Sequence, residues 1–245
     1  MKLKIVMLLV TIAATVTNAE AQFFKNLENK VGIPATNTGG GFTQDEAGQA
    51  IKEALTKGIT HGVDLVSVTD GYFKNPAIKI PMPQEAQQVE SVLRSAGMGS
   101  MIDNAVESFN HAAENAAKAA TNIFINAIKQ LTINDAISMV NNQQKDAATQ
   151  FLKRTTTDQL IAAFKPSIKD ALDKANATKY WNDIMTQYNR VPFHSPVNTD
   201  LPDYVTRKAI DGLFYMVAQE EAKIRKDPAA QTSALLKKVF GNVKQ

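Results

Sequence analysis

The sequence predicts an all-α protein, a single-domain bundle of roughly eight to ten helices around one core. Three observations predict this fold class. Apolar residues recur at three- and four-residue spacing through most of the chain, which is the period of amphipathic helices. Helix-capping residues, prolines and glycines separate these stretches. Only residues 78–82 alternate with the two-residue period of a strand, and we expect a short extended arm there.

Residues 1–21 have the three-part layout of a secretory signal peptide. Two lysines precede an uncharged, mostly apolar run over 5–16, and Ala19-Glu20-Ala21 has the small-residue pattern that signal peptidase cleaves. The run is shorter than the ~20 residues that cross a bilayer, which argues against a membrane anchor. We therefore expect an exported protein whose mature chain begins at Gln22.

The composition argues against several kinds of chemistry and of binding partner. The 245 residues include no cysteine, so we expect no lipid anchor on cysteine, no disulfide and no thiol nucleophile. The chain has 27 basic and 24 acidic residues, and removal of residues 1–21 leaves 25 and 23, a net charge of +2. So small a charge argues against a nucleic-acid partner. No segment after residue 21 is long and apolar enough to suggest a membrane span.

The folded domain is predicted over residues 43–245, after a flexible N-terminal tether over 22–42. Three consecutive glycines near the end of the tether disfavour both helix and strand. Thr43 and Glu46 have the spacing of a capping box, which predicts the start of the first helix. Gly58 and Gly62 lie beside the apolar stripe of this helix and favour close helix packing. The stripe is Ala47, Ile51, Leu55, Ile59 and Val63.

Turn-forming residues at 70–76 predict a break before the arm. Two prolines force the residues before them into extended backbone, so the apolar side chains of the arm should face one way: Ile78, Ile80 and Met82. A helix is predicted from about Pro83, with Gly97 and Gly99 ending it. Its expected buried face is Val89, Val92, Leu93 and Ala96.

One long helix is predicted over 100–131, with an alanine-rich centre that would allow close approach of a neighbouring helix. Its stripe is Ile102, Ala105, Phe109, Ala112, Ala116, Ile123, Ala127 and Leu131. Capping residues then predict three helix starts, at Thr132, at Asp146 and at Thr156 or Thr157. Pro166 should kink or split the last of these helices.

The C-terminal part contains an aromatic helical face, a proline-containing loop over 190–200 and a long last helix. The aromatic face is Tyr180, Trp181, Ile184, Met185 and Tyr188. Asp200 is predicted to cap the last long helix, whose stripe is Val205, Ala209, Leu213, Met216, Val217 and Ile224. A further helix is predicted after Asp227-Pro228, up to Gly241.

No catalytic template is present. The sequence has no nucleophile elbow, no phosphate-binding loop and no paired-histidine metal motif, so we expect no metal and no cofactor. The three histidines are far apart, and none has metal-ligand spacing with another. His61 and Asp64 are three residues apart on one helix and could share a hydrogen bond, more plausibly as a structural pair than as a site. The sequence does not decide whether the protein is an enzyme.

Two carboxylates on the last long helix are the main site candidates. Glu220 and Glu221 follow the apolar stripe at four-residue spacing, and a buried carboxylate must be paired or protonated. Asp211 lies on the same helix. Arginines that could pair with these carboxylates are Arg94, Arg154, Arg207 and Arg225. The alternatives are an ion pair that fixes helix packing and, less favoured, an acid/base or ligand-binding carboxylate.

Aromatic side chains supply the other candidates for ligand binding. Tyr180 and Trp181, with Tyr188, Phe193 and Phe214, could line a pocket for an apolar or aromatic ligand. An aromatic face at helical spacing is more often plain core, and we keep both interpretations.

A series of separated motifs is similar to one known family. The motifs lie, in order, at residues 70–83, 112–114, 123–128, 146–151, 203–214, 224–230 and 235–241. They resemble DUF4197, an uncharacterised bacterial family of exported proteins. The resemblance implies a helical fold and an envelope location, with the periplasm favoured, and it implies no activity. Lys118 stands where relatives often have a proline, so we expect the long helix to be less kinked here.

Three functions remain open from the sequence. The favoured one is a non-enzymatic envelope protein that binds a partner protein or an apolar small molecule between its helices. The second is a hydrolase-like enzyme that uses Glu220 or Glu221 with an arginine and a histidine. The third is a purely structural role in the envelope.

Overall fold

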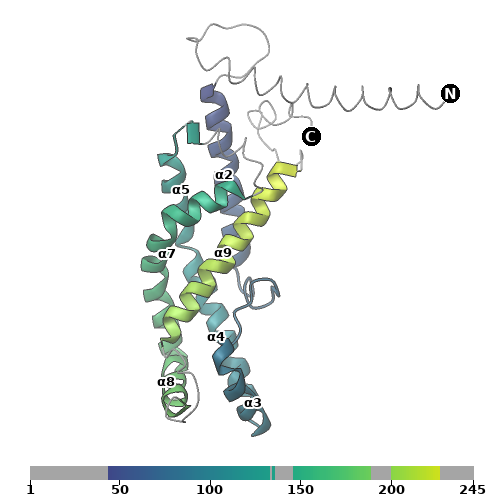
Figure 1. The fold of residues 1–245 in the computed structure, drawn as a ribbon, viewed down its shortest axis with the longest axis vertical. Coiled ribbons are helices and arrows are strands. Elements are labelled where there is room, and N and C mark those ends of the chain that lie inside the picture. The colour runs from purple at the N-terminus through teal and green to yellow at the C-terminus, as the bar shows by residue number, and fades with distance from the viewer. Residues whose placement is uncertain (1–43, 133, 136–145, 189–199, 227–245) are drawn as a thin grey trace, which may run out of the picture. The chain divides into compact units, whose positions relative to one another are not determined.

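The structure is a computed structural model, and it describes residues 44–132, 134–135, 146–188 and 200–226. Within these ranges seven α-helices have defined bounds and no β-strand occurs, which confirms the all-α prediction (Figure 1). The helices are α2 (Gln44–Ser67), α3 (Gln87–Ser95), α4 (Gly99–Ala117), α5 (Ala120–Gln130), α7 (Ala147–Lys174), α8 (Ala177–Tyr188) and α9 (Leu201–Lys226), with a 3₁₀ turn, η1 (Gln84–Ala86), before α3.

Three helices form the centre of the bundle. α4, α7 and α9 pack against one another, α5 packs on α7, and α8 contacts both α7 and α9 (Figure 1). The predicted stripes supply the core, because the spacing of their apolar residues keeps these on one helical face. Fully buried members of this core include Phe109, Phe124, Leu160, Phe164, Ile168 and Leu213.

α2 joins this core through its own stripe and its close approach to α9. Ile59 and Val63 are buried in the core, as predicted. A Cβ atom at Gly62 would lie 3.6 Å from the Cα and N atoms of Val217, so the two helix backbones come close there. This contact confirms the prediction that the glycines of α2 favour close packing.

The arm after α2 has the predicted pattern of burial, although its first residue, Ile78, still belongs to a turn in which its N–H donates to the Asn75 carbonyl at 3.2 Å. Ile78, Ile80 and Met82 are buried, whereas Lys79 and Pro81 between them are exposed. This alternation is that of a strand. The arm packs on its own bundle, since these three side chains belong to the same core as α4 and α9.

The predicted buried face of the next helix is wrong in part. Val89 and Leu93 are partly buried against the core, but Val92 is 67% exposed and Ala96 is also exposed. In the part of the chain that the structure describes, α3 packs mainly on α4, so this one long neighbour covers only part of its apolar face. Gly97 ends α3 as predicted, with φ of 80° and the two C-terminal hydrogen bonds of a Schellman motif. Gly99, by contrast, begins α4.

The predicted long helix over 100–131 is divided into α4 and α5. The break lies at Lys118-Ala119, where the Ala119 N–H donates to the Ala116 carbonyl at 3.1 Å in a tightened turn. That Lys118 leaves this helix less kinked than in relatives stays a prediction, although the helix of this chain is interrupted at that residue. The break lets α5 pack on α7 while α4 stays against α7 and α9. The break therefore occurs without a proline.

The predicted helix start at Thr156 or Thr157 is also wrong, because α7 runs without interruption through both residues. Their hydroxyls donate to the carbonyls four residues earlier, at 2.6 Å for Thr156 to Leu152 and at 2.5 Å for Thr157 to Lys153. The hydroxyls thus stay within the helix and do not cap a new one. Pro166 lies inside the same helix at an exposed position, so it does not split the helix, and a kink there stays a prediction.

Two predicted caps are confirmed. The Thr132 hydroxyl accepts the Asp135 N–H at 3.1 Å, and the Asp135 carboxylate accepts the Thr132 N–H at 3.2 Å, which is a reciprocal capping box. Asp200 accepts the Asp203 N–H at 2.9 Å at the start of α9. The predicted tether, the Thr43 cap, the loop over 190–199 and the helix after Asp227 lie outside the described residues. In the helices that the structure describes, none is long and apolar enough to cross a membrane.

Candidate functional site

The most distinctive local structure lies in the connection between α2 and η1. There the residues 78–82 and the turn before them form one segment, residues 70–82, and the name arm covers this whole segment from here on. It begins with Asp70 in the left-handed region at φ of 67°, which non-glycine residues rarely adopt. Gly71 follows, and a Cβ there would lie 2.7 Å from the carbonyl oxygens of both Leu65 and Val66. The chain therefore turns back sharply on the end of α2, and only glycine fits at the second position.

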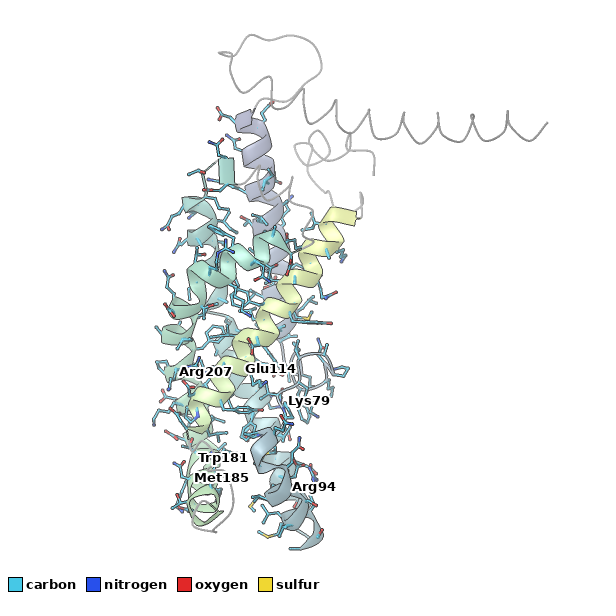
Figure 2. All side chains as sticks on the ribbon, viewed as in Figure 1. Lys79, Arg94, Glu114, Trp181, Met185 and Arg207 are labelled. Atoms are coloured by element: carbon cyan, nitrogen blue, oxygen red, sulfur yellow. The ribbon has the colours of Figure 1, made fainter. Side chains whose placement is uncertain are left out.

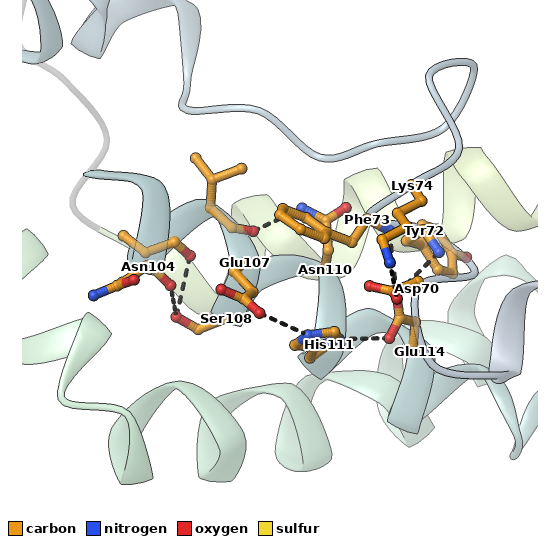
Figure 3. Close-up of polar contacts among 12 residues, drawn as sticks. Asp70, Tyr72, Phe73, Lys74, Asn104, Glu107, Ser108, Asn110, His111 and Glu114 are labelled. Carbon is orange, nitrogen blue, oxygen red and sulfur yellow. Dashed lines mark hydrogen bonds and ion pairs between the residues drawn. The ribbon is translucent and has the colours of Figure 1, made fainter. Parts of the chain in front are cut away.

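Glu114 of α4 fixes the start of the arm. Its Oε1 atom accepts the backbone N–H groups of Tyr72 at 3.0 Å and Phe73 at 3.1 Å, although the residue is only 4% exposed (Figure 3). Hydrogen bonds to an ionised acceptor are the stronger kind, contributing about 1.5–3 kcal/mol each. A buried carboxylate thus anchors to α4 an irregular segment whose own backbone hydrogen bonds are only those of short turns.

Asn110, one helical turn before Glu114, fixes the extended part of the arm. Its Oδ1 accepts the Ile80 N–H at 2.8 Å, and its Nδ2 donates to the Ile80 carbonyl at 2.9 Å. The same Nδ2 donates to the Val106 carbonyl at 2.7 Å. The Asn110 side chain is fully buried, so it replaces the neighbouring strand that an extended segment ordinarily needs.

α9 holds the other side of the arm. The buried Tyr72 hydroxyl donates to the Ala209 carbonyl at 2.6 Å, and the Tyr204 hydroxyl donates to the Pro81 carbonyl at 3.0 Å. Burial, together with the nearby Glu114 carboxylate, raises the pKa of Tyr72, which keeps its hydroxyl protonated. Gly212 lies under the arm, where a Cβ would be 2.8 Å from Cε1 of Tyr72.

His111 connects the buried anchor to the surface. Its Nδ1 lies 2.7 Å from Glu114 Oε2, and its Nε2 lies 3.4 Å from Glu107 Oε1 (Figure 3). The hydrogen bond to Glu114 raises the pKa of His111 above its ordinary value, and the carboxylate of Glu107 adds to the effect. The Phe73 ring of the arm packs against the imidazole, with ring centroids 5.9 Å apart.

The outer side of the arm carries aromatic and cationic groups. The Lys79 ammonium lies over the Phe73 ring, 4.3 Å from its centroid, and Lys74 forms an ion pair with Asp70 at 2.8 Å. Within the part of the chain that the structure describes, Lys79 has no carboxylate within ion-pair distance. The arm therefore exposes an ammonium group and the edge of an aromatic ring to solvent, while side chains of α4 hold its backbone in place.

In the structure, the Glu221 side chain of α9 binds the N-terminus of α7. It is 7% exposed, and its two oxygens accept the N–H groups of Ala148 at 3.1 Å and Thr149 at 2.8 Å. The Thr149 hydroxyl donates to the same carboxylate at 2.7 Å. Glu221 thus caps α7, where an anion also interacts favourably with the helix dipole. Asp146 was expected to be this cap, but its side chain instead accepts from the Gln150 amide.

Glu220 lies on the α2 side of α9 and pairs with a histidine. Its Oε2 is 3.0 Å from Nδ1 of His61, so the imidazole expected beside Asp64 contacts α9 instead. Asp211 is exposed on α9. The side chain of Arg225 is outside the described residues.

Arg94 lies on α3 and forms ion pairs with Glu90 at 2.9 Å and Asp103 at 2.7 Å (Figure 2). Arg207 pairs with Asp203 at 2.7 Å. Neither arginine is brought to the carboxylates at the end of α9, because their own acidic neighbours hold them.

The aromatic candidates for ligand binding lie in different environments. Trp181 is 4% exposed and packs in the core with Met185, whereas Tyr180 is 52% exposed beside Lys179. The Trp181 Nε1–H has no hydrogen-bond partner among the described residues. The structure therefore does not bring Tyr180 and Trp181 together on one surface.

Sequence reasoning missed the residues that hold the arm: Asn110, His111 and Glu114. A signal was present, because Asn110 and Glu114 are four residues apart and adjoin the alanine-rich buried face. Across the described ranges no three His, Asp or Glu side chains gather closely enough to hold a metal ion. The side chains that hold the arm fix the position of its backbone. Among themselves they form no recognisable catalytic group.

The fold and the arm together define a class: an all-helical protein that presents an irregular segment on a bundle by means of buried polar side chains. A family model described as "Protein of unknown function (DUF4197)" matches residues 41–241, and the chain belongs to this family. The match confirms the resemblance seen in the sequence motifs. No curated protein and no solved structure shows significant similarity to the chain.

Proposed function

We propose that the protein is an exported, non-enzymatic binding protein of the cell envelope, whose recognition element is the arm. One observation carries this proposal: two buried polar side chains, Glu114 and Asn110, bond to the backbone of a segment that buries its apolar side chains and exposes its two lysines, at 74 and 79. Exposed segments that a rigid scaffold positions are the usual place for recognition. The layout of residues 1–21 supports export.

Strain at the start of the arm supports the same conclusion. Asp70 holds a left-handed conformation that costs a non-glycine residue of order 1 kcal/mol. Such conformations persist where the surrounding structure fixes them, and they cluster at functional positions. Here the fixing groups are the Glu114 carboxylate below and the Asp70–Lys74 ion pair above.

The arm is suited to recognition by side chains and not by strand addition. Asn110 occupies both the N–H and the carbonyl of Ile80, and the Pro81 carbonyl accepts from Tyr204. Proline also has no N–H to donate. A partner therefore meets Phe73, Lys74 and Lys79, which favour a protein surface that offers carboxylates beside apolar side chains.

A photo-crosslinking amino acid at position 79 tests this proposal in intact cells of the native host. We expect a discrete adduct with an envelope protein from Lys79 and from Lys74, because both side chains are exposed on the arm. Lys153, an exposed lysine of α7, is the matched control and should give no such adduct. Equal labelling from Lys153 and Lys79, or no adduct from the arm, would contradict the proposal. Native mass spectrometry of the same preparation would show a retained small molecule as the competing outcome.

The Glu220–His61 contact is the observation that favours an enzyme instead. A carboxylate 3.0 Å from an imidazole nitrogen is an arrangement that orients a general base. The alternative is a hydrolase-like enzyme that uses this pair. It predicts that Glu220→Gln abolishes a hydrolytic activity measurable on ester or peptide probes with the wild-type protein. If wild type and variant are both inactive, this alternative fails.

A further inference from the structure

We infer that His111 is a pH-dependent latch for the arm: the protonated imidazole holds Glu114 in the position where this carboxylate accepts the Tyr72 and Phe73 amides. The latch itself follows from geometry alone. The idea that this latch controls binding of a partner rests on the proposed function.

The two oxygens of Glu114 have separate partners. Oε1 accepts the two amides of the arm at 3.0 and 3.1 Å, and Oε2 faces Nδ1 of His111 at 2.7 Å. The carboxylate is almost completely buried, while the imidazole is partly accessible to water. A proton can therefore enter or leave at His111 without any movement of the arm.

Charged groups around the latch come from α4 and from the arm. Glu107 and Glu114, both on α4, are the groups that raise the pKa of His111. From the arm, the Lys74 ammonium is close enough to Glu107 that this carboxylate contributes to raising the pKa of Lys74, although the hydrogen bond to Asp70 is the main cause. The Lys79 ammonium rests on the Phe73 ring, and that ring packs against the imidazole.

Loss of the His111 proton leaves Glu114 as a buried anion whose imidazole neighbour is neutral. A buried carboxylate without a cationic partner is unfavourable, and it regains water only when the covering segment moves away. Deprotonation should therefore shift the equilibrium toward an arm detached from α4, while α4 itself stays helical.

The direction of the pH effect follows from the raised pKa. A group whose pKa is higher in the docked state stabilises that state fully at pH values below its ordinary pKa, about 6.5 for histidine. The stabilisation is lost as pH rises through the raised pKa. The arm should thus be held tightly in mildly acidic solution and loosely in alkaline solution.

Amide hydrogen exchange at Tyr72 and Phe73, corrected for the intrinsic effect of pH on exchange, tests the latch. In the wild-type chain we expect the protection factors of these two amides to fall about two- to fivefold between pH 5.5 and 8.5, the range typical of a partly exposed ion pair. His111→Asn keeps a donor near the Nδ1 position but does not titrate, and it should remove this pH dependence. His61→Asn removes the other histidine–glutamate pair and should leave it unchanged.

Protection that is equal at both pH values in the wild type would overturn the inference. So would an unchanged pH dependence in His111→Asn, provided that circular dichroism shows a folded variant. These readouts need no partner protein, so a failed latch is distinguishable from a failed binding function. Crosslinking from Lys79 without pH-dependent protection would retain the binding proposal and remove the latch.

Discussion

Glu221→Ala should destabilise the protein by about 3 kcal/mol, because it removes a buried charged acceptor and leaves its donors unpaired. The Ala148 and Thr149 N–H groups and the Thr149 hydroxyl all donate to this carboxylate. Urea unfolding of the mature chain, followed by helical circular dichroism, measures the change. For a domain of this size the same loss corresponds to a lowering of Tm by roughly 6–12 °C.

Two variants separate the cap from the helix that carries it. Gln219→Ala changes an exposed residue on the same part of α9 and should alter the free energy of unfolding by no more than about 0.5 kcal/mol. Glu221→Gln keeps an acceptor oxygen but loses the charge at the α7 N-terminus, so its loss should be intermediate. If Glu221→Ala were as stable as Gln219→Ala, Glu221 would not be the cap of α7.

The helices could be predicted because their signal is repetitive. Val205, Ala209 and Leu213 are all fully buried on α9, as their four-residue spacing indicated. The alternation in the arm was equally readable, since Pro81 and Pro83 leave the backbone few alternatives to an extended form. In both cases the local sequence and the tertiary packing require the same conformation.

Helix boundaries were harder to predict where one residue type serves two purposes. A threonine can cap a helix or return its hydroxyl to the carbonyl four residues earlier, and Thr156 does the second. Thr156 is completely buried within α7, so its hydroxyl bonds within the helix. This burial is a property of the tertiary structure that the local sequence does not show. The break at Lys118 is similar, since no proline or glycine marks it in the sequence and the helix that follows it packs on α7.

The arm's anchors were missed, although their spacing gave a signal, because their partners are distant in the sequence. Glu114 bonds to amides 42 and 41 residues away, and Asn110 bonds to Ile80, 30 residues away. Polar residues on a helix are ordinarily solvent-exposed, so the sequence favours that interpretation until the arm is placed. Glu221 was recognised as a buried carboxylate from its spacing, but its bonds to the start of α7 were not foreseen, because Thr149 is 72 residues away.

Gly212→Val should detach the arm and destabilise the protein by about 2–3 kcal/mol. A Cβ at this position would lie 2.8 Å from Cε1 of Tyr72 and 3.1 Å from Cβ of Ile78. Tyr72 has no room to yield, because it is fully buried and its hydroxyl is bound to the Ala209 carbonyl. Urea unfolding gives the stability change, and hydrogen exchange at Tyr72 and Phe73 reports the arm.

Helix propensity cannot cause this loss, because valine is a better helix former than glycine. Gly58→Ala is the matched control on α2. Its Cβ would lie 2.7 Å from the Cδ1 end of the Ile224 side chain, which can rotate away, and at an ordinary contact distance of 3.8 Å from the Glu220 Cβ. Gly58→Ala should therefore be neutral or stabilising by up to about 1 kcal/mol. A Gly212→Val protein with full stability and protected arm amides would show that Tyr72 and Ile78 are not seated on α9. The proposed recognition by the arm and the proposed latch at His111 both require Tyr72 and Ile78 to pack on α9.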